Sequence, residues 1–299
     1  MAYSKQCEER AQKFIYDVIH TENQPFFFEQ LLTTIHDAIK QDKILIDEDG
    51  DEDDPQFRVK IYVRIQLELI QNTMLSPTVR TAFLDILGEG LVNDNTMWMK
   101  QHILRFLARY LCMEDKACMS RAFMQNLEKA AENNKLMDKN MVLCLGFSNA
   151  SSLGKILGEY SIFLPSELFL GLPNSPNWGC VLIRARRGEN RYIKKMLKLA
   201  ENETPVERCR LFEDMTVVHQ DACVNYLYEY LISDKRLPPL RTCDPGNLMG
   251  GFAACALAKM LEGFPECKEP YFYKTEDLEP YRKWMKEQKT FKFRKTNRK

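Results

Sequence analysis

The chain has 299 residues, of which 45% are apolar and 28% charged, an ordinary composition for a globular protein. Its 42 basic and 42 acidic residues give a formal net charge of zero, which argues against binding a polyanion through bulk charge alone. No stretch approaches the ~20 apolar residues of a membrane span, and the N-terminal segment lacks the apolar run of a signal peptide. We therefore expect a cytoplasmic protein with no membrane contact.

Ten cysteines are scattered along the chain without a Cys-x-x-Cys pair. Several, such as Cys209, fall on apolar helix faces, where a free thiol acts as a small hydrophobe. His219 lies four residues before Cys223, but a zinc site needs about four ligands and no second pair has suitable spacing. We expect free thiols, no structural disulfide, no zinc and no other cofactor.

Helical spacing of apolar residues covers most of the chain, and no convincing alternating strand interrupts it. A capping residue followed by proline marks several helix starts, as at Thr204-Pro205 and Asp244-Pro245. Pairing the helices in order gives seven antiparallel hairpins. The predicted helices span 4–20, 25–41, 56–74, 77–93, 96–112, 115–131, 138–147, 152–164, 176–187, 190–201, 205–217, 221–233, 247–263 and 276–288.

An acidic run, DEDGDEDD at 47–54, lies between two predicted helices. It does not match a calcium-binding EF-hand loop, because placing Gly50 at the sixth position puts Leu45 at the first. The run is interpreted as a solvated loop between hairpins. The alternative is a docking segment for a basic partner.

The connection at 165–175 is the best candidate for a break between two halves of the chain. It contains Pro165 and Pro173, but it is apolar enough to pack as a bend. The predicted organisation is a less regular N-terminal helical array at 1–164, the bend at 165–175, a C-terminal array at 176–288 and a basic tail at 289–299.

Residues 176–233 contain two copies of one helix–turn–helix unit, which begin at Pro176 and Pro205. One hairpin cannot bury its apolar face alone, so neighbouring hairpins must stack. The predicted core faces are Trp178, Val181, Leu182 and Ala185, then Ile193, Met196, Leu197 and Ala200, then Val206, Cys209, Phe212 and Met215, and finally Val224, Leu227, Tyr228 and Leu231.

Four segments carry small residues on a first helix, a short polar turn and an apolar second helix. In these features the chain resembles HEAT-repeat proteins, whose first helix commonly opens with Pro and then Val-Arg, approximated here by Pro205, Val206 and Arg208. The resemblance implies a right-handed α-solenoid of about seven stacked antiparallel helix pairs, used for binding macromolecules. The segments are 79–90, 142–157, 181–212 and 252–263.

Basic residues concentrate in two places. Seven of them and one acid lie between residues 184 and 198, and nine with one acid lie between 282 and 299, where Phe291 and Phe293 are interleaved. Such a tail suits RNA, DNA or an acidic protein, and it is also typical of a disordered end. Four members of the first group follow helical i, i+3, i+4, i+7 spacing opposite the Ile193/Met196/Leu197 face. This α-helical basic row consists of Arg191, Lys194, Lys195 and Lys198.

We interpret the chain as a non-enzymatic scaffold for protein–protein interaction. It has no phosphate-binding loop, no Gly-x-Ser-x-Gly elbow and no Cys/His nucleophile arrangement. The partner is expected to be a protein with an acidic surface, and nucleic acid is the second candidate. The candidate contact residues are Arg191, Lys194, Lys195, Lys198, Tyr226 and Tyr230.

The alternative is an enzyme. Some DNA glycosylases that excise alkylated bases use a HEAT-like solenoid with a basic groove, aromatic residues and an acid. Trp98, Trp178 and the 184–198 basic cluster allow that comparison, but no catalytic Asp can be aligned, and the zero net charge disfavours strong DNA binding.

Overall fold

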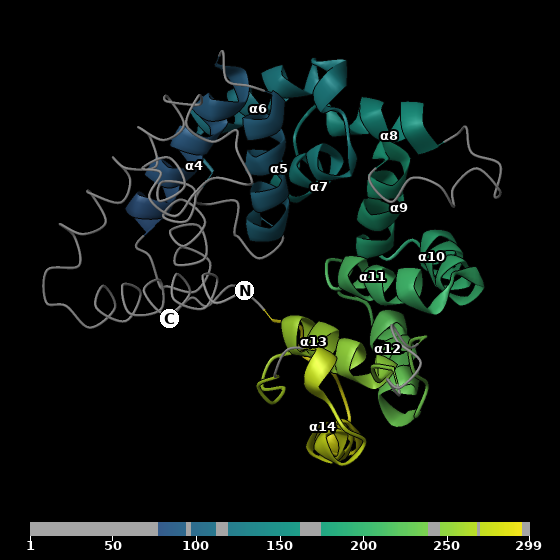
Figure 1. The fold of residues 1–299 in the computed structure, drawn as a ribbon. Helices are drawn as coiled ribbons and strands as arrows, with labels where there is room; N and C mark the ends of the chain where they lie inside the picture. The colour runs from purple at the N-terminus through teal and green to yellow at the C-terminus, as the bar shows by residue number, and fades with distance from the viewer. Residues whose placement is uncertain are drawn as a thin grey trace, which may run out of the picture. The chain divides into compact units, whose positions relative to one another are not determined.

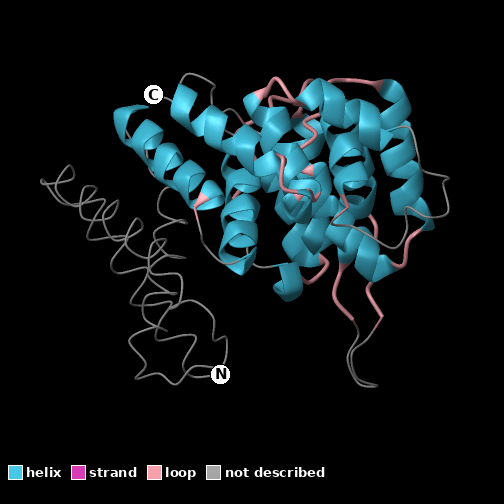
Figure 2. Ribbon diagram, turned by 90° about the horizontal axis from the view of Figure 1, so that it is seen from above, coloured by secondary structure: helices cyan, strands magenta, loops and turns pink. Residues whose placement is uncertain are grey.

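The structure is a computed structural model in which residues 77–93, 97–111, 119–161, 175–238, 246–267 and 270–294 are described (Figure 1). These residues are mostly helical, and no extended strand occurs among them (Figure 2). The all-α class predicted from the sequence is therefore confirmed for this part of the chain. The helices predicted over 4–20, 25–41 and 56–74, and the acidic run 47–54, lie outside the described residues.

The helices agree with the sequence prediction to within three residues at each end, with one exception. The helix predicted from 115 begins at Arg121, because Ser120 adopts an extended backbone and accepts a hydrogen bond from Phe123 N at 3.0 Å. The helices are α4 Pro77–Val92, α5 Met97–Leu111, α6 Arg121–Ala131, α7 Lys139–Ser148, α8 Leu153–Ser161, α9 Pro176–Arg186, α10 Asn190–Asn202, α11 Pro205–Met215, α12 Asp221–Ile232, α13 Met249–Met260 and α14 Glu279–Glu287, with single 3-10 turns η3 Asn134–Leu136, η5 Pro270–Phe272 and η6 Glu276–Leu278.

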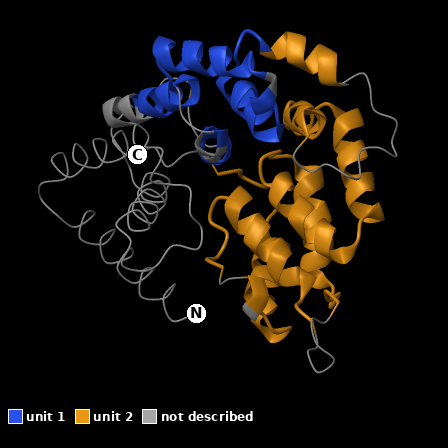
Figure 3. Ribbon diagram, turned by 45° about the horizontal axis from the view of Figure 1, so that its top comes forward, with its two compact units in different colours: residues 1–152, 297–299 blue, residues 153–296 orange. Residues whose placement is uncertain are grey.

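The chain divides into two compact units, which Figure 3 distinguishes by colour. Unit 1 comprises residues 1–152 and 297–299, and unit 2 comprises 153–296. Helix α8 therefore belongs with the C-terminal helices. Residues 162–174, which include nearly all of the predicted bend, lie outside the described part of the chain.

In unit 1, helices α4 to α7 pack on one another. Helix α4 contacts α5, and α6 contacts α7, while α4 also packs on α6 and α5 on α7. The approach of α4 to α6 is close at Gly88, where a Cβ would lie 3.1 Å from Phe123 Cδ2. Pairing in chain order would place α4 with 56–74, which lies outside the described residues, and α5 with α6, whereas α5 packs mainly on α4 and α7.

Unit 2 builds its core from helices in contact with their first and second neighbours. Helix α9 packs on α8 and α10, α10 on α11 and α12, α13 on α11 and α12, and α14 on α12. The fully buried side chains include Met196, Leu227 and Leu257, with Phe212 almost fully buried. Three other residues depart from the predicted core faces: Val206 is 43% exposed, and Leu197 and Tyr228 are half-buried.

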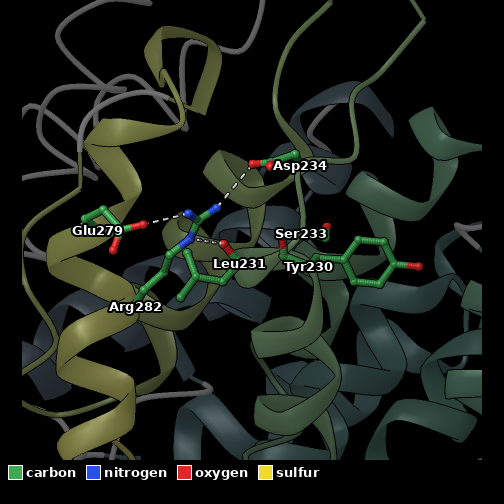
Figure 4. Close-up of polar contacts among 6 residues, drawn as sticks. All are labelled: Tyr230, Leu231, Ser233, Asp234, Glu279 and Arg282. Atoms are coloured by element: carbon green, nitrogen blue, oxygen red, sulfur yellow. Dashed lines mark hydrogen bonds and ion pairs between the residues drawn. The ribbon is translucent and has the colours of Figure 1, made fainter.

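Arginines from neighbouring elements cover the C-terminal ends of several unit 2 helices. Arg208 of α11 donates from Nε to the Ala200 carbonyl at 2.6 Å and from Nη2 to the Glu201 carbonyl at 2.7 Å, at the end of α10. Arg282 of α14 donates from Nε to the Leu231 carbonyl of α12 at 2.9 Å (Figure 4). These carbonyls lack partners within their own helices, and a cation at a helix C-terminus also complements the helix dipole.

Arg282 is fixed on both sides of its guanidinium. Figure 4 shows it between Glu279 of its own helix and Asp234, which follows α12. Its Nη1 lies 2.8 Å from Glu279 Oε1, and its Nη2 lies 3.5 Å from Asp234 Oδ1. The two carboxylates hold a largely buried guanidinium in position against the last turn of α12.

The basic tail, for which the sequence leaves a disordered end as one interpretation, is packed as far as residue 294. Arg294 donates from its backbone N to Met260 O at 2.7 Å and from Nε to Leu261 O at 3.0 Å. Phe293 stacks on His219, with ring centroids 5.4 Å apart. The first part of the tail therefore closes the end of α13, and only residues 295–299 lie outside the description.

Candidate interaction surface

Helix α10 separates an apolar face from a basic one. Ile193, Met196 and Ala200 are buried at helical spacing, as predicted. Leu197 is predicted to join them but is half-buried, because it lies at the edge of the apolar stripe, about 70° from its centre. The buried stripe anchors α10 on its neighbours and leaves the opposite side to solvent.

The basic row predicted from the sequence, Arg191, Lys194, Lys195 and Lys198, occupies that opposite side and is called here the α10 basic row. Its four members differ in environment. Arg191, Lys194 and Lys198 are exposed, and none of them takes part in an ion pair among the described residues. Lys195 is half-buried; burial, and after it the charge of Arg191, lowers the pKa of Lys195. The solvent-facing charge of the row is therefore carried by three side chains.

Two of the three arginines just before α10 have other partners. Arg184 pairs with Glu189, Nη1 to Oε2 at 3.1 Å, and its guanidinium lies over the Tyr192 ring. Arg186 donates to the Val217 carbonyl at the end of α11, and the Gln220 side chain donates in return to the Arg186 carbonyl at 3.0 Å. Arg184 and Arg186 thus stabilise unit 2 rather than extend the exposed row.

The two candidate tyrosines are in the core. Tyr226 and Tyr230 of α12 are 7% and 6% exposed, and both rings pack on Phe212 of α11 at centroid distances of 6.3 and 5.0 Å. Burial raises the pKa of Tyr226. The Arg208 guanidinium lies 5.6 Å from the centre of the Tyr230 ring. The tyrosines therefore join α11 to α12 and do not stand beside the basic row on the surface.

The aromatic and acidic residues relevant to the enzyme alternative are only partly described. Trp178 is 2% exposed, and its indole Nε1 donates to Asp214 Oδ2 at 2.7 Å. The carboxylate accepts the only hydrogen that the indole can donate. The side chain of Trp98 lies outside the described residues.

No cluster of three or more potential metal ligands occurs among the described histidines, cysteines and acids. His219 and Cys223, considered as a pair from their spacing, are used differently. His219 stacks on Phe293, and burial lowers the pKa of His219 to about 4. Cys223 is buried, and burial raises the pKa of its thiol to about 12. None of the described helices is both long and apolar enough to cross a membrane.

Two features of unit 2 were not predicted from the sequence. The first is that arginines cover helix ends. The signal for it in the sequence is the position of Arg208, one turn into α11 and after a short connection. The second is a pair of buried phenols, Tyr273 and Tyr281, whose hydroxyls lie 3.2 Å apart. No spacing rule joins these two residues, because they come from a loop and a helix.

Comparisons of the chain with family models, with curated proteins and with solved structures gave no match.

Proposed function

We propose that the chain is a non-enzymatic binding scaffold that holds an acidic protein partner on the α10 basic row. The observation that carries the proposal is the exposure of Arg191, Lys194 and Lys198 on one helix whose other side is core. Ion-paired cations would gain little from a new partner, whereas these three lack an ion pair among the described residues. An acidic surface would therefore be attracted to them.

The proposed architecture is a HEAT-like solenoid. Packing of α4 on α6 and of α5 on α7, and the contacts of α10 with α12, α11 with α13 and α12 with α14, support this. In such an array each hairpin relies on its neighbours for a core, and surface side chains remain available for contacts. Binding without catalysis is the role that requires the fewest special features of the surface residues.

Charge reversal on the row tests the proposal. Lys195 is spared because it is half-buried, and the variant is Arg191→Glu, Lys194→Glu and Lys198→Glu together. Proteins captured from a cell extract by the immobilised chain are identified by mass spectrometry at low and high salt. We expect an acidic protein that the wild type captures, that salt weakens and that the variant loses.

A matched control reverses three exposed lysines of unit 2 that lie outside both basic groups: Lys155, Lys259 and Lys274. It changes the net charge by the same amount and should leave capture unchanged. Equal loss in the two triple variants would contradict a role for the row. A base-excision assay on alkylated duplex DNA addresses the alternative, since excision that only the row variant removes would favour the enzyme.

A further inference from the structure

The C-terminal segment, residues 282–299, carries nine basic residues and one acid. Three of its cations are engaged within unit 2. Arg282 and Arg294 donate to backbone carbonyls at the ends of α12 and α13. Lys283 Nζ lies 4.0 Å from Oε1 of Glu287, which is the one acid of the segment. These three side chains therefore hold the segment in place and offer little charge to a ligand.

Three lysines of the same segment are directed to solvent. They recur at every third position, each is exposed, and none takes part in an ion pair among the residues that the structure describes. Called here the C-terminal lysines, they are Lys286, Lys289 and Lys292. Lys286 lies in the last turn of α14, and the other two follow the end of that helix at Glu287.

The backbone around Lys292 determines where its side chain points. Hydrogen bonds of 2.8 and 2.7 Å join the backbones of Lys292 and Arg294 to the end of α13 and the residues after it, and Leu261 and Phe293 form an antiparallel bridge there. The Phe293 ring stacks on His219. Neighbouring side chains of an extended segment point to opposite sides, so Lys292 points away from Phe293. A fixed segment therefore presents this lysine to solvent.

Two aromatic rings near these lysines in the chain are only partly covered. Trp284 of α14 and Phe291 are both half-buried. The Trp284 ring packs edge-on against Phe264 at a centroid distance of 5.1 Å, and Phe291 makes no ring contact within the described part of the chain. A partly exposed ring can stack on a planar group, and every nucleic-acid base has such a face. The segment thus combines unpaired cations with rings that a base can reach.

We propose that the C-terminal surface, formed by the C-terminal lysines with Trp284 and Phe291, binds single-stranded nucleic acid. Phosphates pair with the lysine ammonium groups, and unstacked bases lie on the two rings. The surface is separate in sequence from the α10 basic row, and the inference does not depend on the proposed function of that row.

Other anionic partners would use fewer of these features. A duplex keeps its bases stacked inside, so it engages the lysines alone. An acidic protein also pairs with the cations without requiring the rings. Binding in a membrane interface favours a helix with an available apolar face. The apolar residues Tyr281 and Met285 of α14 are buried in unit 2, so this helix has no such face to offer.

Charge reversal on the full chain tests the lysines. The variant is Lys286→Glu, Lys289→Glu and Lys292→Glu together, and the matched control is the triple variant of the α10 basic row, which changes the net charge equally. Fluorescence anisotropy measures binding of labelled oligouridylate and oligothymidylate over a series of salt concentrations. We expect both strands to bind the wild type, because phosphates and bases are common to RNA and DNA.

The slope of log K against log salt concentration should be about two smaller in magnitude for the C-terminal variant, since each phosphate contact of a single strand contributes about 0.7. The row variant should keep the wild-type slope and affinity, and circular dichroism checks that both are folded. The proposal is overturned by no binding of either strand, or by a loss in the row variant that equals or exceeds that in the C-terminal variant. Tighter binding of a duplex, polyglutamate or phosphatidylserine vesicles than of the single strands would also overturn it.

Replacing the rings tests the stacking. Phe291→Leu and Trp284→Leu each keep an apolar side chain but remove the aromatic face, and Phe252→Leu is the control, because it changes another half-buried phenylalanine of unit 2. We expect about fivefold or greater weakening of oligouridylate binding for Phe291→Leu, with an unchanged salt slope, and no change for the control. Unchanged affinity in both ring variants would reduce the contact to charge alone and contradict the assignment of single strands.

Discussion

At the scale of single residues, the environment decides what each basic side chain does. Arg208 and Arg282 end at backbone carbonyls, where they satisfy helix ends. Arg191 and Lys194 point to solvent from a helix whose other face is buried. The sequence groups these residues by density of charge, but density alone does not separate a structural cation from an available one.

The first prediction concerns His219, whose pKa in the folded chain is lowered to about 4. The unfolded chain takes up this proton near pH 6.5, so unfolding is increasingly favoured as pH falls from about 6.5 to 4, by up to about 3 kcal/mol. Above this window the ring is neutral in both states and contributes no such penalty. Urea denaturation across a pH series measures the effect.

The variant His219→Asn provides the comparison, because asparagine tolerates the left-handed backbone at this position, φ 53°. The variant loses the stacking on Phe293 but no longer titrates. Its deficit in unfolding free energy relative to wild type should therefore shrink between pH 7 and pH 4.5. A deficit that is constant over that range would contradict the assigned pKa.

The second prediction concerns Arg208. Replacement by methionine removes its hydrogen bonds to the end of α10 and should lower the free energy of unfolding by about 1–3 kcal/mol. The matched control is Arg210→Met, two residues along the same helix, which removes only an exposed ion pair with Glu207. That change should cost less than about 0.5 kcal/mol. Similar denaturation midpoints for the two variants would show that the covering of α10 is unimportant.

At the scale of elements, local signals predict the bounds of the helices well, and they predict less completely which residues of each helix are buried. The bounds of α10 and α11 follow from apolar spacing and from Thr204, whose hydroxyl accepts from Glu207 N at 3.3 Å. Burial of residues at the edge of a stripe depends on which neighbours pack there. The predicted burial of Leu197 and Val206 is wrong for this reason, because no local pattern gives the positions of those neighbours.

The third prediction compares a fully buried residue of the apolar stripe in α10 with a half-buried residue at its edge. Met196 is fully buried, so Met196→Ala should destabilise the chain by about 2–5 kcal/mol. Leu197→Ala removes a half-buried side chain and should cost clearly less. Chemical denaturation of both variants measures the difference. A larger loss for Leu197→Ala would restore the face assignment made from the sequence.

The fourth prediction contrasts two helical glycines. Gly251→Ala brings a Cβ against the Pro270 carbonyl and should destabilise unit 2 by about 1–3 kcal/mol. At Gly158 of α8, no atom lies within 4 Å of the position that a Cβ would take. Gly158→Ala should therefore stabilise the chain by about 0.4–1 kcal/mol, as alanine favours the helix. Thermal unfolding shifts of opposite sign are expected, and shifts of the same sign would contradict the close approach.

At the scale of the whole molecule, the sequence predicts the class of fold and leaves the function open. A net charge of zero conceals the uneven placement of cations, and only the structure separates Arg191 and Lys198 from arginines bound to carbonyls. The candidate tyrosines illustrate the same limit. Tyr226 and Tyr230 are one turn apart and suited to a binding face by sequence, yet their rings complete the packing between α11 and α12.

The arginine contacts at helix ends have a consequence for local unfolding. A helix usually frays from its terminus, but the last turn of α12 cannot open without breaking its bond from Arg282 of α14. The end of α13 is likewise tied to Arg294. Opening one terminus therefore disturbs another segment, and amide hydrogens of these last turns should exchange with solvent as members of a shared cooperative unit rather than one helix at a time.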